Sequence, residues 1–260
     1  MSYTAAILAF LLSAGLAGAV SYAVHRRLSY DLRRRHHDVG SAIFLQMGVI
    51  YAVLLAFVFS EVWGEYNAAA QAINAECGAL HASAILAHDL PNDAGDALNL
   101  AIAAYVATVV TREWPSMEGR QASVEAVRGV EAMLKAAIIL DRPRAPNTIA
   151  QAEILNLLAQ AHAQRETRIF QMTQGMPALL WALLLFYALV LVSFVLCSGV
   201  EHAATLALFS SLFAAGLALI LVMIRMLDFP FEGALGLPSA TFQETLLKVS
   251  VLVRLAHGGI

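Results

Sequence analysis

The sequence predicts an all-α membrane protein with four transmembrane helices and a helical-bundle domain inserted between the second and third helices. Two observations support this fold class. Hydrophobic residues make up 60% of the 260 residues and charged residues only 13%, whereas about 25% charged residues are usual in soluble domains. The apolar residues gather in four long runs, and between the second and third runs they recur at helical spacing.

Each of the four runs is long enough to cross a hydrocarbon core of about 30 Å, which needs about 20 helical residues. None carries a charge near its centre. The predicted spans are residues 3–24, 42–63, 176–197 and 203–226. The predicted regions are 1–64 with the first two spans, 65–174 with the soluble bundle, 175–228 with the last two spans, and 229–260 with a Pro/Gly turn and an amphipathic helix.

The first run is predicted to be a retained membrane helix, because a secretory signal carries its positive charge before the apolar stretch. Here the start, MSYTA, has no charged side chain, and a basic loop follows the run. The arginines of this loop are Arg26, Arg27, Arg33, Arg34 and Arg35. Short arginine-rich loops stay in the cytoplasm, so the N-terminus and the bundle are predicted to lie outside. A site for anionic lipid headgroups is a second interpretation of these arginines.

The second run is predicted to continue into the bundle as one long helix. Between Trp63 and Leu90 the only helix-breaking residues are two glycines, and apolar residues recur at helical spacing. Roughly 48 residues at about 1.5 Å each would give a helix about 70 Å long. It should stop before Pro91, because the residue before a proline disfavours helix.

Three more helices are predicted in the bundle, over about 93–113, 118–140 and 148–173. Asp93 is expected to cap the first of these helices, and Pro115 is expected to end it. On the second, one stripe is expected to face inward, formed by Val127, Glu131, Leu134 and Ile138. The tail 239–256 is predicted to be an amphipathic helix that lies on the membrane surface or against a neighbouring subunit.

Ionisable residues gather near one predicted membrane boundary. Glu61 and Glu65 are one helical turn apart on the second span, and Arg225 and Asp228 end the fourth span, with Glu232 just beyond. Such groups are costly near hydrocarbon unless they are paired or hydrated. The sequence therefore predicts either a structural ion pair of Arg225 with Asp228 or Glu61, or an acidic, hydrated pore mouth that favours cations.

Two further positions on the long helix are candidates for an ion pathway. Phe57 lies one turn below Glu61 and is either an apolar gate or a lipid-facing or helix-facing residue. Glu76 lies on the apolar side of the helix, between Ile73 and Leu80. It is either a buried acid bonded to another bundle helix or one member of an acidic ring around an oligomer axis.

The sequence holds no familiar catalytic or cofactor motif: it has no G-x-G-x-x-G, Walker lysine motif, H-E-x-x-H or G-x-S-x-G. We therefore predict neither an enzyme nor a cofactor. His81 and His88 are seven residues apart and could share a helix face, but this pair alone does not predict a metal site. Cys77 and Cys197 are far apart and predict no disulfide framework. The net charge of −3 gives no basic surface for nucleic acid.

The order of spans and motifs resembles the bacterial bestrophin-like membrane family. The resemblance runs from about Gly48 to Phe242 and rests on the stretches AINAECGAL, YVATVVTREWPSM and LDFPFEG. Its most specific residues are Glu76, Tyr105, Glu113, Trp114, Pro115, Asp228, Pro230, Phe231 and Gly233.

The resemblance implies a homo-oligomer, a pentamer as in bestrophins, that lies in the bacterial inner membrane and conducts inorganic ions along its second span. Bestrophins are similar in outline and are calcium-binding anion channels with a cytosolic helical domain. Here the acids near the second span favour cations, no acidic run resembles the calcium clasp, and the arginine loop places the bundle outside. The alternative function is a non-conducting membrane scaffold or sensor whose bundle binds a partner.

Overall fold

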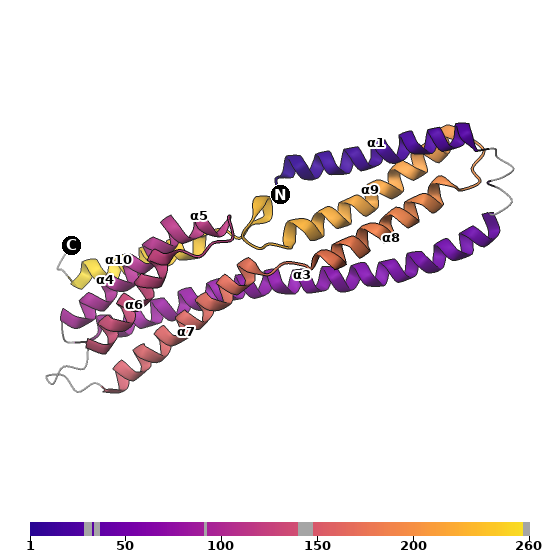
Figure 1. Cartoon of the computed structure of the whole chain (residues 1–260). Coiled ribbons are helices and arrows are strands. Elements are labelled where there is room, and N and C mark those ends of the chain that lie inside the picture. Colours follow the sequence, from indigo (N-terminus) through magenta and orange to yellow (C-terminus); the bar gives the residue numbers. More distant parts are fainter. Residues whose placement is uncertain (29–32, 34–36, 91–92, 140–147, 257–260) are drawn as a thin grey trace. The chain divides into compact units, whose positions relative to one another are not determined.

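The structure is a computed structural model that describes residues 1–28, 33, 37–90, 93–139 and 148–256. Every regular element in these ranges is helical. The chain forms two compact units (Figure 1). The first unit comprises Met1–Gly64 and Gly175–Asp228, and the second unit comprises Glu65–Gln174 and Phe229–Ile260.

Four helices are long and apolar enough to span a membrane. They are α1 (Tyr3–Arg27), α3 (His37–His88), α8 (Ala178–Leu196) and α9 (Ala203–Leu227). This confirms the four predicted spans, with ends that differ by a few residues. The 19 residues of α8 cover roughly 28 Å, which matches a hydrocarbon core of about 30 Å.

The second span does continue as one long helix. α3 has 52 residues and contributes to both units, because the boundary between them falls between Gly64 and Glu65. Its last helical residue is His88, shortly before Pro91, as predicted from the restriction that proline places on the preceding residue.

Small residues bring α1 and α9 close together in the first unit (Figure 1). The hydroxyl of Ser210 donates a hydrogen bond to that of Ser21 at 3.2 Å, and the hydroxyl of Ser211 donates to the carbonyl of Ala14 at 2.9 Å. A Cβ atom on Gly18 would lie 2.6 Å from Oγ of Ser211. Small residues and interhelical hydrogen bonds of this kind hold helices together in membranes, where the hydrophobic effect contributes little to helix association.

One face of α3 packs inside the first unit and the opposite face is exposed. The buried positions are Tyr51, Leu55, Val58 and Val62, which follow helical spacing. The ring of Tyr51 stacks on that of Tyr187 of α8, with centroids 6.0 Å apart. In the protomer, the exposed face is free for lipid or for another copy of the chain.

The second unit is a bundle built around the second half of α3. Its other elements are α4 (Asp93–Thr108), the π-helical turn η1 (Val109–Glu113), α5 (Trp114–Met117), α6 (Val124–Ile139), α7 (Thr148–Thr173), the 3-10 turn η2 (Gly233–Leu235) and α10 (Ala240–Ala256). Apolar side chains from α3, α4, α6, α7 and α10 form one core.

The prediction that Pro115 ends the helix begun at Asp93 was wrong. The chain passes from α4 through η1 into α5, which ends at Met117. Within η1 the N–H of Trp114 bonds to the carbonyl of Val109, five residues back. Proline lacks an N–H and clashes with the carbonyl four residues back, and a wider π turn relieves this conflict without breaking the helix.

The next helix starts later than predicted and buries a different stripe. Gly119 and Arg120 form a turn in which Arg120 has a φ of 58°, and the Ser123 hydroxyl then accepts the N–H of Ala126 at 3.3 Å to start α6. The buried residues are Ala126, Val130, Met133 and Ala137, one residue before the predicted stripe. This face of α6 approaches α4 closely, since a Cβ atom on Gly129 would lie 2.9 Å from the Tyr105 ring.

The helical tail was predicted correctly, but both predicted locations for its apolar face were wrong. α10 packs on α4 inside the second unit, and Phe242 and Val249 are fully buried in the core. Its apolar positions match the space left by the other helices, so α10 is a member of the bundle.

Candidate functional site

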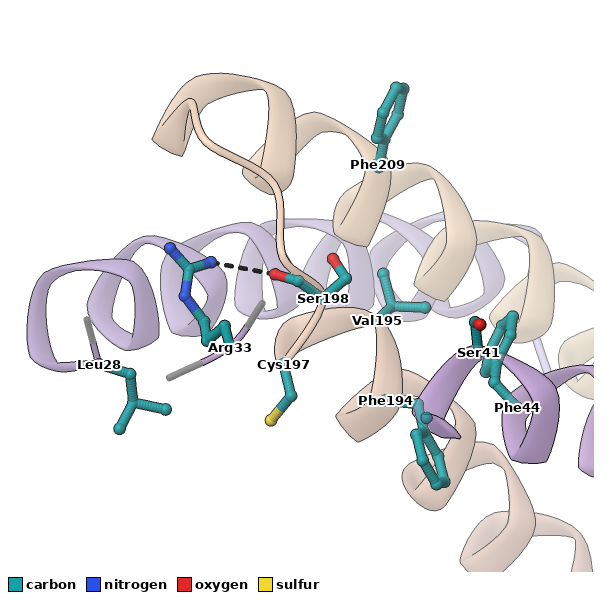
Figure 2. A pocket seen from close by; sticks show the side chains of 10 residues that line it. Leu28, Arg33, Ser41, Phe44, Phe194, Val195, Cys197, Ser198 and Phe209 are labelled. Carbon is teal, nitrogen blue, oxygen red and sulfur yellow. Dashed lines mark hydrogen bonds between the residues drawn. The ribbon is translucent and has the colours of Figure 1, made fainter. Parts of the chain in front are cut away.

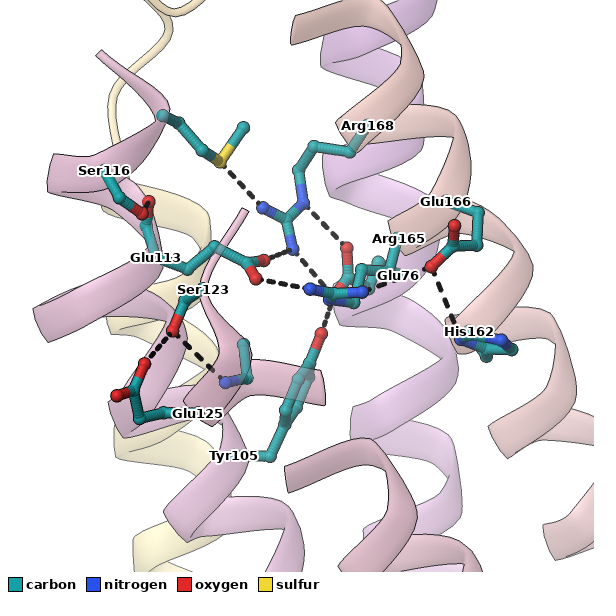
Figure 3. A network of polar contacts seen from close by, with 12 residues as sticks. Glu76, Tyr105, Glu113, Ser116, Ser123, Glu125, His162, Arg165, Glu166 and Arg168 are labelled. Atoms are coloured by element: carbon teal, nitrogen blue, oxygen red, sulfur yellow. Dashed lines mark hydrogen bonds and ion pairs between the residues drawn. The ribbon is translucent and has the colours of Figure 1, made fainter. Parts of the chain in front are cut away.

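A cluster of buried charges lies inside the second unit (Figure 3). Its members are Glu76 of α3, Tyr105 of α4, Glu113 of η1, and Arg165 and Arg168 of α7. Each is at most 3% exposed. Two carboxylates face two guanidinium groups, so the charges balance inside the bundle.

Arg168 lies at the centre of this cluster. Its Nε donates to Oε2 of Glu76 at 2.9 Å, and its Nη2 donates to Oε1 of Glu113 at 2.7 Å. Its Nη1 lies 3.0 Å from the sulfur of Met117, and the guanidinium carbon is 5.1 Å from the centroid of the Phe242 ring. Every guanidinium nitrogen therefore has a partner, as a fully buried charge requires.

The other members complete the links between helices. Nη2 of Arg165 donates to Oε2 of Glu113 at 2.6 Å, and the Tyr105 hydroxyl donates to Oε1 of Glu76 at 2.5 Å. The π turn places Glu113 between the two arginines, consistent with the frequent occurrence of such turns at special sites. The cluster thus joins α3, α4, η1 and α7.

The electrostatics keep Arg168 and Tyr105 in fixed protonation states. Burial works to lower the pKa of Arg168, but attraction to Glu76 and Glu113 outweighs it, and the pKa is raised. Burial, together with the Glu76 charge, raises the pKa of Tyr105 well above its usual value. Neither group changes charge near neutral pH. The cluster is suited to holding helices in register rather than to transferring protons.

The sequence analysis missed both arginines, although a pattern for them exists. The buried stripe of α7 runs through Ile154, Leu158 and Ala161 and continues at the same spacing through Arg165 and Arg168. A charged residue that continues an apolar stripe must be paired inside the core. Two positive positions on the buried stripe of α7 therefore pointed to acids on the facing helices.

The exposed face of α3 in the first unit is the second candidate site. Phe57 is 74% exposed, and Glu61 is exposed one turn further along the helix. Among the residues that the structure describes, no hydrogen bond or ion pair involves the carboxylate of Glu61. A charged carboxylate on a membrane span raises the free energy of the protein unless water or an oppositely charged group solvates it.

Comparison with known proteins identifies the family. The model of the bestrophin-like domain matches residues 11–242. The chain belongs to the bestrophin-like family. This bestrophin-like chain is a multi-pass membrane protein, as both its four spans and its family indicate. No curated protein matches its sequence.

Solved structures share the fold of this bestrophin-like protein. One variant of a bacterial bestrophin homolog from Klebsiella pneumoniae has a TM-score of 0.76 at 13% identity, covering 96% of this chain and 97% of that chain. A second variant of that homolog has a TM-score of 0.72 at 13% identity, covering 97% and 99%. A further membrane-protein structure has a TM-score of 0.74 at 14% identity, covering 95% and 98%. At these identities the likeness shows the fold alone.

The motif residues of the bestrophin-like chain converge in the charge cluster. Glu76 comes from one motif stretch and Tyr105 and Glu113 from another, and all three meet around Arg168. Of the two interpretations of Glu76, the contacts match the buried acid bonded to another helix. Inside the protomer its carboxylate faces α4 and α7, so it is not available to line an axis.

The carboxylate of Asp228 is buried and holds two helix ends together. Asp228 is 2% exposed, and its carboxylate accepts the backbone N–H of Met176 at 2.7 Å and the indole N–H of Trp181 at 3.4 Å. These two donors tie the end of α9 to the beginning of α8 independently of Arg225. Arg225 lies half-buried in the last turn of α9.

The remaining acids differ in their surroundings. Glu232 forms an ion pair with Arg120, whose guanidinium lies over the Phe229 ring, so its charge is neutralised within the second unit. Glu65 is half-buried on α3. Glu61 is thus the most exposed of the predicted mouth acids.

The arginines of the basic loop have separate environments. The guanidinium of Arg26 lies over the Tyr22 ring with its carbon 4.9 Å from the centroid, Arg27 is exposed, and Arg33 is 5% exposed. Arg34 and Arg35 lie outside the described residues. Of the three described arginines, Arg33 is the one enclosed by the protein.

Proposed function

We propose that this bestrophin-like protein is a homo-oligomeric ion channel whose pore is lined by the first half of α3. Membership of the family supports a channel. The exposed face of α3 supports this helix as the lining, because its other face is already packed in the first unit. Other copies of the chain would place the exposed faces around a common axis.

The single observation that carries the proposal is the exposed pair Phe57 and Glu61. The pair sets a large apolar ring and a carboxylate one turn apart on the unpacked face of a span. Facing lipid, the carboxylate would be costly; facing a hydrated axis, it is solvated. Repeated around the axis, Phe57 forms an apolar constriction and Glu61 an acidic mouth that concentrates cations.

Recording from the pure protein in planar bilayers tests this function. Cation-selective currents are expected, and Glu61→Gln should move the cation-to-anion permeability ratio toward one by up to about tenfold, because the local concentration of cations falls. Phe57→Ala should raise the conductance by widening the constriction. Glu118→Gln, which removes an exposed acid from the second unit, and Phe186→Ala, which removes an exposed ring from α8, are the matched controls.

Absence of current over a range of salt, pH and calcium concentration would refute the channel and favour the scaffold. If Glu61→Gln and wild type give currents with the same reversal potential, the protein is a channel but Glu61 does not contribute to its ion selectivity.

We further propose that the N-terminus and the helical bundle lie outside the inner membrane. The arginine-rich loop supports this orientation, because such loops remain cytoplasmic. The turn between α8 and α9 would then also be cytoplasmic.

The two native cysteines provide a direct test of orientation. Cys197 is exposed at the end of α8, and Cys77 is buried. A membrane-impermeant maleimide should label Cys197 only after the inner membrane is permeabilised, and the Cys197→Ser variant should stay unlabelled. Labelling of Cys197 in intact spheroplasts would reverse the orientation.

A further inference from the structure

A pocket of about 470 Å³ opens in the first unit where three spans end or begin (Figure 2). Its volume lies within the range of about 300–1,000 Å³ that is typical of ligand sites. Its lining comes from Leu28 after α1, the beginning of α3, the end of α8 with Cys197 and Ser198, and Phe209 of α9.

The walls of the pocket are mainly apolar and aromatic. Phe44 of α3 lies against Phe194 of α8, with centroids 6.3 Å apart, and Phe209 and Val195 add to the lining. An apolar pocket at the end of the spans suits a hydrocarbon chain that enters from the neighbouring bilayer.

One buried cation interrupts this apolar lining. Arg33 is 5% exposed and lines the pocket. One Nη donates to the carbonyl of Ser198 at 3.1 Å, and the other donates to Nδ1 of His25 at 3.0 Å. Arginine can only donate, so Nδ1 of His25 is the acceptor of this hydrogen bond. Neither acceptor carries a negative charge.

The charge of Arg33 is uncompensated among the described residues. Within these residues no carboxylate forms an ion pair with it, and its buried Nε has no hydrogen-bond partner. A buried charge is costly unless it is paired. The free Nε donor and the uncompensated charge together call for an anion.

We propose that this pocket binds an anionic phospholipid, with its phosphate at Arg33 and part of an acyl chain along Phe44, Phe194 and Phe209. Arginine binds phosphate through charge-assisted hydrogen bonds, and one donor of Arg33 is unused. The ends of the spans place Arg33 at the depth of lipid headgroups, where basic pockets recognise anionic lipids. The apolar walls favour a lipid over a free anion, which would leave them uncovered.

The test compares the binding of a fluorescent phosphatidylglycerol to delipidated wild type, Arg33→Gln and Arg27→Gln. Arg33→Gln should weaken binding about tenfold or more, because it removes a charged hydrogen-bond donor. Arg27→Gln removes the same charge from an exposed residue of the same loop and should change binding less than about twofold. Phosphatidylcholine and inorganic phosphate should not displace the probe.

Protection of Cys197 gives a second measurement that needs no substitution. Cys197 is exposed and lines the pocket, so a bound lipid should cover its thiol. Its maleimide modification should be slower in vesicles that contain phosphatidylglycerol than in vesicles of pure phosphatidylcholine.

Three results would overturn the proposal. Equal affinity of the probe for wild type and Arg33→Gln, with Cys197 equally reactive in both kinds of vesicle, would show that the lipid does not bind in this pocket. Equal binding of phosphatidylcholine would show an apolar site that does not use the charge of Arg33. Displacement of the probe by millimolar phosphate would show a simple anion site.

Discussion

Replacement of Arg168 with methionine is expected to lower the free energy of unfolding by about 3–5 kcal/mol. Arg168 is fully buried and binds both Glu76 and Glu113. The substitution keeps much of the side-chain volume but leaves both carboxylates without their central cation. Breaking a buried ion pair is costly because the remaining charge stays in the low-dielectric interior.

Chemical unfolding of the purified protein in detergent, followed by circular dichroism, measures this loss. Arg128→Met, on the exposed face of α6, is the matched control and should change the free energy by less than about 0.5 kcal/mol. The double variant Arg168→Met with Glu76→Gln should recover part of the loss, because it removes one of the uncompensated charges. A single variant as stable as the control, or a double variant with no recovery, would contradict a charge-based role for the cluster.

Replacement of Gly95 with alanine is expected to destabilise the protein by at least about 1–3 kcal/mol, the usual cost of overpacking. Gly95 lies in the first turn of α4, against the last turn of α3. A Cβ atom there would lie 2.1 Å from the carbonyl oxygen of Ala87. That oxygen also accepts the N–H of Leu90 at 3.2 Å. The contact is with backbone, so the two helices must move apart to relieve it.

Thermal unfolding midpoints of Gly95→Ala and Gly78→Ala provide the comparison. Gly78 lies inside α3, and among the described residues no neighbouring side chain or other helix comes within 4 Å of the place that a Cβ atom would take. Alanine at position 78 should therefore stabilise the helix by about 0.5–1 kcal/mol. The two substitutions make the same chemical change and should have opposite signs. If both raise the midpoint, the tight approach of α3 and α4 is not present in solution.

The charge cluster and the exposed face of α3 divide the acids of the long helix between two roles. Glu76 is held by Tyr105 and Arg168 inside the bundle, whereas Glu61 faces outward from a span. A glutamate thus joins helices in the second unit, and another glutamate is a proposed ion-binding group in the first unit. The difference comes from what surrounds each carboxylate.

Membrane spans were predictable because the bilayer imposes a simple requirement on the sequence. Each span must be long, apolar and free of central charges, and α1, α3, α8 and α9 satisfy this locally. The length of α3 was also predictable, because the helical pattern after Trp63 continues until shortly before Pro91. Of the nine residues on which the resemblance to the family rested, the structure brings Glu76, Tyr105 and Glu113 together around Arg168.

Features that depend on close contact between helices were not predictable from local patterns. The continuation past Pro115 depends on a π turn, and the stripe of α6 is set by how closely Gly129 approaches Tyr105. Arg165 and Arg168 went unnoticed because their acidic partners lie 52 to 92 positions away in the sequence. The apolar stripe of α7 shows that these arginines are buried, but it does not show which acids pair with them.

The sequence by itself determined the number and limits of the spans, the long helix and the all-α class, since hydrophobic length and helical periodicity are local properties. The tertiary structure alone decided which acids are neutralised and which stay exposed. It placed Glu76 and Asp228 among donors, Glu61 on an open face, and Arg33 in an apolar pocket. The reason is physical: the energy of a charge depends on the groups that surround it in space.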